Sequence, residues 1–164
     1  MRGFSLLETV IAIAILVAAI LGPLTLASSS IRLASLAKNN LTAATLAEEG
    51  IELIRTTRGN SLIAGSTWDS WIMGLQSGDC FAAAGCRIDA QNSNVESCIG
   101  FSCVLNLDGD LYTYASGNPS AFTRKINIVE IAPGVEVRVK STVSWRDRFG
   151  IKSFELTEQM LNWQ

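Results

Sequence analysis

The stretch FSLLETVIAIAILVAAILGPLTLA, residues 4–27, decides the fold of this 164-residue chain. It carries no charge from Val10 to Ala27, and from Phe4 to Leu26 thirteen of its residues are Leu, Ile, Val or Phe. These side chains favour insertion into a bilayer by about 4 to 8 kcal/mol, whereas an acid opposes it by about 3 kcal/mol at most. We therefore expect a membrane-spanning helix over residues 4–27.

Glu8 is the acid that interrupts this apolar stretch. An ionisable group inside a membrane segment is a functional hypothesis by default, and it requires a cationic partner. The alternative is that Glu8 lies at the level of the lipid headgroups and has no role. Charge and length alone do not decide between the two interpretations.

The apolar pattern continues beyond the span, and it predicts an amphipathic helix over residues 28–58. The members of this stripe recur at spacings of three to five residues: Leu33, Leu36, Leu41, Ala44, Ala47, Ile51 and Ile54. Arg58-Gly59-Asn60 is typical of a helix end, because Gly and Asn accept the left-handed cap conformation. Residues 59–164 then form a head domain.

The head domain begins with a stretch of poor periodicity, residues 59–103, which we expect to be loop-like and anchored to the core by Trp68 and Trp71. Beyond it the alternation is that of strands, with a hairpin turn at Asp108-Gly109-Asp110. The expected strands are residues 101–107, 111–114, 122–131, 135–145 and 152–156. Short turns between strands predict an antiparallel sheet, covered on one face by the amphipathic helix, and thus an α+β fold.

The four cysteines all lie in the loop 80–103: Cys80, Cys86, Cys98 and Cys103. An even number beyond a membrane segment indicates disulfides in an oxidising compartment, so we expect an extracytoplasmic head domain. Three pairings are open, and the ease of closing small loops favours Cys80–Cys86 with Cys98–Cys103. A four-cysteine zinc site is the weaker alternative, because the spacing lacks the usual CxxC knuckle. A secretory signal cleaved near Ala27 competes with the anchored chain.

The composition gives no sign of catalysis or of a cofactor. The chain has no histidine, no Gly-rich phosphate loop, no GxSxG and no HExxH. Asp108 and Asp110, with Asn106, are candidate calcium ligands, although a tight turn is the stronger interpretation. We expect a non-enzymatic protein without cofactors, and a signal-anchored extracytoplasmic enzyme is the weakest alternative.

Charge is distributed unevenly along the head domain, although the net charge of the chain is only −2 and gives no general attraction to nucleic acid. Residues 69–110 contain six acids and one base, and residues 124–152 contain seven bases and three acids. The two segments either meet within one fold, meet between neighbouring subunits, or carry ordinary scattered surface charge.

The opening residues carry the most specific signal. Gly3-Phe4-Ser5-Leu6-Leu7-Glu8, followed by a long apolar helix, resembles the processing and assembly motif of type IV pilins and pseudopilins. The resemblance implies that a prepilin peptidase removes the leader, residues 1–3, by cutting between Gly3 and Phe4, and methylates the new Phe4 amine. It also implies that Glu8 faces the Phe4 amine of an adjacent subunit, so that residues 4–27 become the filament core.

The same resemblance implies partners and a location. The partners are other pilin or pseudopilin subunits, prepilin peptidase, an inner-membrane assembly platform and, before assembly, membrane lipid. The location is a bacterial inner membrane, with the N-terminus cytoplasmic, and then a pilus or pseudopilus. Three segments resemble minor pilins, or the pilus modification and minor pseudopilin branch of the family: AEEGIELIR at residues 47–55, Val143-Ser144-Trp145 and Asn162-Trp163. A minor pilin that binds DNA, a surface or a secreted substrate is therefore the alternative to a structural subunit.

Overall fold

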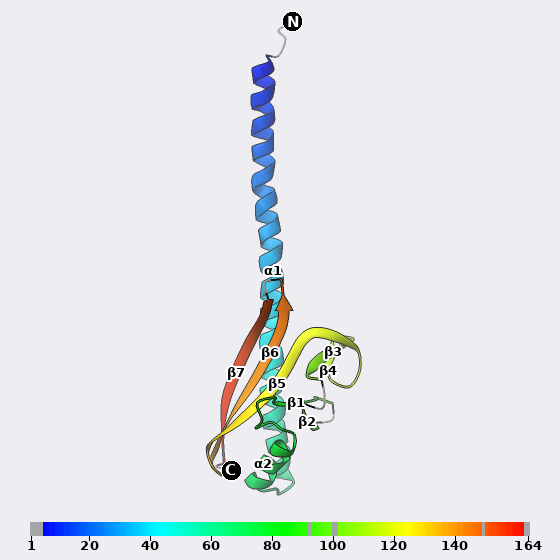
Figure 1. Cartoon of the computed structure of the whole chain (residues 1–164), viewed down its shortest axis with the longest axis vertical. Helices are drawn as coiled ribbons and strands as arrows, with labels where there is room; N and C mark the ends of the chain where they lie inside the picture. The colour runs from blue at the N-terminus through cyan, green and yellow to red at the C-terminus, as the bar shows by residue number, and fades with distance from the viewer. Residues whose placement is uncertain (1–4, 92, 100–101, 149, 163–164) are drawn as a thin grey trace. The chain divides into compact units, whose positions relative to one another are not determined.

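The computed structural model describes residues 5–91, 93–99, 102–148 and 150–162 (Figure 1). The chain divides into two compact units, residues 1–40 and residues 41–164. Helix α1 (Leu6–Ile63) begins in the first unit and ends in the second. The first unit consists of helix in its described part, and each of its residues from Ser5 to Ser35 is exposed.

The second unit contains a short helix and an antiparallel sheet of seven strands in the part of the chain that the structure describes. Its elements are α2 (Trp68–Ser77), β1 (Cys86–Ile88), β2 (Val95–Ser97), β3 (Val104–Asp108), β4 (Leu111–Thr113), β5 (Asn118–Ala132), β6 (Glu136–Asp147) and β7 (Gly150–Leu161). The long strand β5 pairs with β1, β3 and β6, while β7 pairs with β6. The expected α+β class, with a long N-terminal helix and a C-terminal antiparallel sheet, is confirmed.

The second part of α1 covers one face of the sheet, as the sequence predicts. Its buried residues follow helical spacing: Ala43, Leu46, Ala47, Gly50, Ile51, Ile54 and Arg58. Those with apolar side chains pack in two clusters, one with Ile126, Ile128, Val137 and Val139, and one with Leu105, Phe122, Val143 and Trp145. Inward residues of β5 and β6 alternate with outward ones, so one face of each strand supplies the core.

The predicted stripe was wrong at its N-terminal end. Leu33 and Leu41 are 63% and 68% exposed, and the buried stripe starts at Ala43. At 3.6 residues per turn, Leu41 points to the side of α1 opposite Ala43 and Ala47, because the five-residue step from Leu36 breaks the helical phase. Ala47 and Ile51 belong to the core as predicted.

The predicted helix end at Arg58-Gly59-Asn60 was also wrong, because α1 continues to Ile63. Gly65 has a φ of 72° and takes the left-handed position instead. Its N–H donates to the carbonyl of Leu62 at 3.0 Å, and the N–H of Ser66 donates to the carbonyl of Ser61 at 2.9 Å. These two bonds are the pattern of a Schellman cap, so Gly65 rather than Gly59 ends the helix.

Helix α2 lies within the stretch predicted to be loop-like, so that prediction was wrong for residues 68–77. The hydroxyl of Thr67 caps the helix by accepting the N–H of Ser70 at 3.3 Å. The apolar residues of α2 recur with helical spacing and are buried: Trp68, Trp71, Ile72 and Leu75. The expected anchoring of this stretch by its two tryptophans is therefore confirmed, but through a helix rather than a loop.

The predicted strands agree with the structure except at their ends, whereas the short strands β1 and β2 were not predicted, because they lie in the stretch expected to be loop-like. Asp108 of β3 pairs with Leu111 of β4 across a two-residue turn, in which Gly109 has a φ of 60°. Strand β5 begins earlier than predicted, at Asn118, and β7 extends to Leu161. Val135 lies outside β6 and is 56% exposed, because it belongs to the turn that joins β5 to β6.

Two disulfides close small loops in the segment before the long strands. They join Cys80 to Cys86 and Cys98 to Cys103, the pairing that the sequence favours. No free cysteine remains among the described residues, so these sulfurs are not arranged as zinc ligands. The first disulfide lies in the core, since Cys80 and Cys86 are both fully buried.

Candidate functional site

The start of α1 places Glu8 in the first helical turn. Ser5 begins the helix, because its hydroxyl accepts the N–H of Leu7 at 3.3 Å and its carbonyl accepts the N–H groups of Glu8 and Thr9. The spacing Ser5-x-x-Glu8 is that of a capping box, and an acid in the first turn interacts favourably with the helix dipole. The sequence therefore has a local reason to place an acid here, in addition to any role in assembly.

The surface of α1 in the first unit is largely apolar, and over residues 10–24 it is apolar on all sides. Its exposed large side chains are Leu6, Leu7, Val10, Ile11, Ile13, Ile15, Leu16, Val17, Ile20, Leu21, Leu24, Leu26, Ile31 and Leu33. A helix that is apolar all round is stable only inside a membrane or inside a larger assembly. Among the described residues, α1 is the one helix long and apolar enough to cross a membrane.

Glu8 is exposed, and within the described part of the chain no cation pairs with it. It is also the one charged residue between Leu6 and Ile31 in the sequence. Gly3 and Phe4, the proposed cleavage and methylation positions, lie outside the described residues. The structure thus provides a helix with an uncovered apolar surface and one acid near its beginning.

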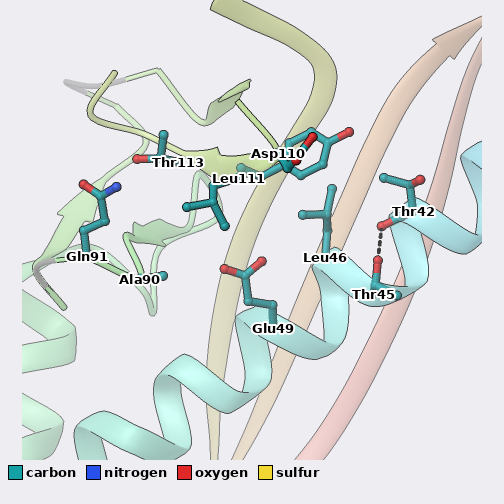
Figure 2. Close-up of a pocket in the computed structure, with 10 residues that line it drawn as sticks. Thr42, Thr45, Leu46, Glu49, Ala90, Gln91, Asp110, Leu111 and Thr113 are labelled. Carbon is teal, nitrogen blue, oxygen red and sulfur yellow. Dashed lines mark hydrogen bonds between the residues drawn. The ribbon is translucent and has the colours of Figure 1, made fainter. Parts of the chain in front are cut away.

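A pocket of about 430 Å³ lies in the second unit (Figure 2). Side chains of α1 line one side of it, and those of β4 and the segment after β1 line the other. The lining residues are Thr42, Thr45, Leu46, Glu49, Ala90, Gln91, Asp110, Leu111, Tyr112 and Thr113. Sequence reasoning missed this pocket, because its walls come from three segments far apart in the chain.

The calcium candidates Asp108 and Asp110 are not part of a metal cluster in the structure. Asp108 accepts a hydrogen bond from the hydroxyl of Ser116 at 2.6 Å, while Asp110 lines the pocket. The described residues contain no group of three or more His, Cys, Asp or Glu side chains that could hold a metal ion. In this structure the Asp108-Gly109-Asp110 segment is a hairpin turn.

Arg124 is a buried cation in the core beside the pocket, and its side chain is 1% exposed. Its guanidinium donates to the backbone carbonyls of Leu46 and Ile88, each at 3.2 Å, and pairs with Glu49 at 3.0 Å. It also donates to the hydroxyl of Tyr114 at 3.3 Å, and that hydroxyl donates to the backbone carbonyl of Arg124 at 2.9 Å. This one side chain therefore ties α1 to β1 and β5.

Asp89 is the second buried charge of this region, with 6% of its surface exposed. Its carboxylate accepts the hydroxyl of Thr113 at 2.9 Å and the N–H groups of Tyr114 and Gln91 at 2.7 and 2.9 Å. Burial alone would raise the pKa of Asp89, but these hydrogen bonds and the charge of Arg124 lower the pKa overall. The carboxylate thus stays ionised and holds the end of β4 in place.

The lowered pKa of Asp89 predicts a loss of stability in acid. A carboxylate with a lower pKa in the folded state stabilises the fold above its unfolded pKa of about 3.9, and the contribution is lost as the pH falls through the folded pKa. We expect Asp89→Asn to lower the free energy of unfolding at pH 7 by about 1 to 3 kcal/mol. We also expect it to flatten the decline of the free energy of unfolding below about pH 4.

Denaturant unfolding from pH 2 to pH 7 measures both effects, with Asp69→Asn, an exposed acid, as control. Parallel pH curves for the wild type and the Asp89 variant would contradict this assignment.

In comparisons with other proteins, the chain matches no family model, no curated protein and no solved structure. The architecture, a long apolar N-terminal helix and an antiparallel sheet packed on the second part of that helix, is consistent with a pilin-like fold.

Proposed function

We propose that this chain is a structural subunit of a type IV pilus or a related pseudopilus, held in the membrane and then in the filament by the first part of α1. The proposal rests on the opening motif and the exposed apolar helix taken together. A prepilin-like motif, Gly3 to Glu8, directly precedes a helix whose whole surface from Ser5 to Ser35 is exposed and largely apolar. A soluble monomer does not leave such a surface uncovered.

Glu8 then has a defined role in assembly. Prepilin peptidase would cut after Gly3 and leave a new amine on Phe4. The Phe4 amine of the adjacent subunit is then the cation that pairs with Glu8. An attraction between two opposite charges is several times stronger in a medium of low dielectric than in water. Because an unpaired buried charge is costly, the pair also fixes the axial position of one subunit against the next.

The fold of the second unit supports the location outside the cytoplasm. Both disulfides lie there, and disulfides persist in oxidising compartments. The proposal therefore places the N-terminus in the cytoplasm, α1 in the bacterial inner membrane, and the head domain beyond it. Prepilin peptidase, an assembly platform and neighbouring pilin-like subunits are the proposed partners, and the chain itself has no proposed catalytic role.

Mass analysis of the N-terminus tests the proposal. In membranes that contain an active prepilin peptidase, we expect the mature chain to begin at Phe4 and to carry one added methyl group. We expect Gly3→Val to retain residues 1–3, because the peptidase backbone cannot approach a branched side chain as closely as it approaches glycine. Leu33→Val, distant from the cleavage position, is the matched control. A mature chain that still begins at Met1, or one cut near Ala27, would overturn the proposal.

A further inference from the structure

We infer that the pocket between α1 and β4 receives a basic side chain from the outer sheet face of a second copy of this chain. The inference rests on the proposed function, because an assembling subunit meets copies of itself in a fixed orientation. It goes beyond that function by naming the two surfaces that meet. The pocket is the one in Figure 2, and the basic surface is the face of β5 and β6 opposite their buried residues.

The pocket is suited to a lysine or arginine side chain. Glu49 and Asp110 bring two carboxylates to its walls, and neither Lys nor Arg lines it. Leu46 and Leu111 offer apolar contact for the methylene stem of such a side chain, and Leu111 is 66% exposed in the single chain. A volume of about 430 Å³ lies within the range of sites that hold ligands.

Asp110 supplies the stronger attraction of the two acids. Glu49 is already partly neutralised, because it pairs with buried Arg124 at 3.0 Å. Asp110 is exposed and forms no ion pair with any residue that the structure describes. A cation entering the pocket would therefore gain a free carboxylate at the rim and a shared one at the wall.

The complementary surface is a basic group on the outer sheet face, which we call the basic face: Lys125, Arg138 and Lys140. Alternation along the strands sets these residues opposite the buried ones, and Lys140 lies across from Asn127 while Arg138 lies across from Val129. Lys140 contacts Glu155 at 3.5 Å, an exposed pair of little strength. Lys125 and Arg138 have no acidic partner in the described part of the chain.

The two surfaces do not neutralise each other within one copy. Among the ion pairs of the described residues, none joins an acid of residues 69–110 to a base of residues 124–152. The pocket lies on the side of the sheet that carries α1, and the basic face lies on the other side. In the described part of one copy, the two charged segments meet only in the core, where the charge of Arg124 lowers the pKa of Asp89. Asp110 and the basic face form no ion pair with each other in one copy, so complementary charge directs their association between copies.

This contact joins two different surfaces, so it is heterologous. A heterologous contact leaves one pocket and one basic face unfilled at the ends of any row of copies, and it repeats into an open helical filament unless the rotation closes a ring. That is the symmetry a pilus or pseudopilus requires.

Zero-length carbodiimide cross-linking of the full chain tests the contact, because the reagent joins a carboxylate directly to a lysine amine. Nitrogen-15-labelled and unlabelled chains would be mixed during assembly and the cross-linked peptides identified by mass. We expect hybrid peptides, in which one half is labelled and the other is not, that link Asp110 or Glu49 of one chain to Lys125 or Lys140 of another. We expect Asp110→Arg or Arg138→Glu to reduce the yield of the hybrid links from Glu49 by about tenfold. We expect a chain that carries both substitutions to restore this yield.

The controls are charge reversals outside both surfaces, Asp69→Arg and Arg148→Glu, which we expect to leave the links unchanged. Links confined within single chains, or links from Asp110 to a different protein only, would overturn the inference. Chains that begin at methylated Phe4 and assemble, yet give no hybrid link, would overturn this contact but not the proposed function. Hybrid links between chains that still begin at Met1 would support the contact and overturn the proposed function.

Discussion

Replacing Glu8 by alanine is expected to abolish filament assembly while membrane insertion and cleavage continue. Insertion persists because the acid opposes it, and its removal lowers that cost by about 3 kcal/mol at most. Assembly fails because the Phe4 amine of the neighbouring subunit is left unpaired in the filament core. Removing one partner of a buried ion pair costs about 3 to 5 kcal/mol, and this corresponds to at least a hundredfold loss at equilibrium. The amount of subunit in sheared filaments, relative to the amount in membranes, measures the effect.

Two further variants separate assembly from the local role of Glu8 at the start of α1. Glu8→Gln keeps the sequence spacing of a capping box with Ser5 but removes the charge. We expect this variant to insert and to be cleaved, but to assemble as poorly as Glu8→Ala. Thr9→Ala, which removes only a hydroxyl bonded to the carbonyl of Leu6, is the matched control. Normal incorporation of the glutamine variant would show that Glu8 serves only to begin the helix.

Replacing Arg124 by methionine is expected to destabilise the head domain by about 3 kcal/mol. The substitution removes the guanidinium that donates to the carbonyls of Leu46 and Ile88 in the core, and it leaves Glu49 without its cation. The expected loss is at the low end of the range for a broken buried pair, because the side chain of Glu49 is 34% exposed and is solvated through the pocket.

Urea unfolding of the full chain in detergent, followed by tryptophan fluorescence, measures this loss as a lower midpoint with an unchanged slope. Lys125→Met is the matched control, because Lys125 follows Arg124 on the same strand but points to the outer face. We expect the control to change the free energy of unfolding by less than about 0.5 kcal/mol. Equal midpoints for the two variants would show that the Arg124 contacts do not hold α1 to the sheet.

The sheet and the packed helix were predictable because their signals are local and repeated. Val137, Val139 and Val143 alternate along one strand, and the Asp108-Gly109-Asp110 turn fixes a hairpin. Helix α2 carries an equally local signal, a Thr67 cap followed by apolar residues with helical spacing. It was missed because the high Gly, Ser and Asn content of residues 59–103 outweighed a pattern only ten residues long.

The buried network was only half predictable. Phe122 and Ile126 point into the core, so strand alternation assigns Arg124 to the same face, and the sequence therefore indicates a buried cation. Its partners do not follow from the sequence, because the carbonyls of Leu46 and Ile88 reach it only after α1 packs on the sheet. The pocket is missed for the same physical reason. The interpretation of Glu8 comes from the opening motif and not from any contact.

The order of the elements along the chain has a consequence for biogenesis. The buried stripe of α1 ends at Arg58, yet Val137, Val139 and Trp145, which cover much of it, belong to the penultimate strand. Such non-local contacts form slowly, because a long intervening loop must close first. The two small disulfide loops between them close over short distances and need not wait. The buried stripe of α1 is therefore synthesised before the strand that covers it. A nascent chain exposes this stripe to proteases and to aggregation until β6 has been synthesised and has packed on it.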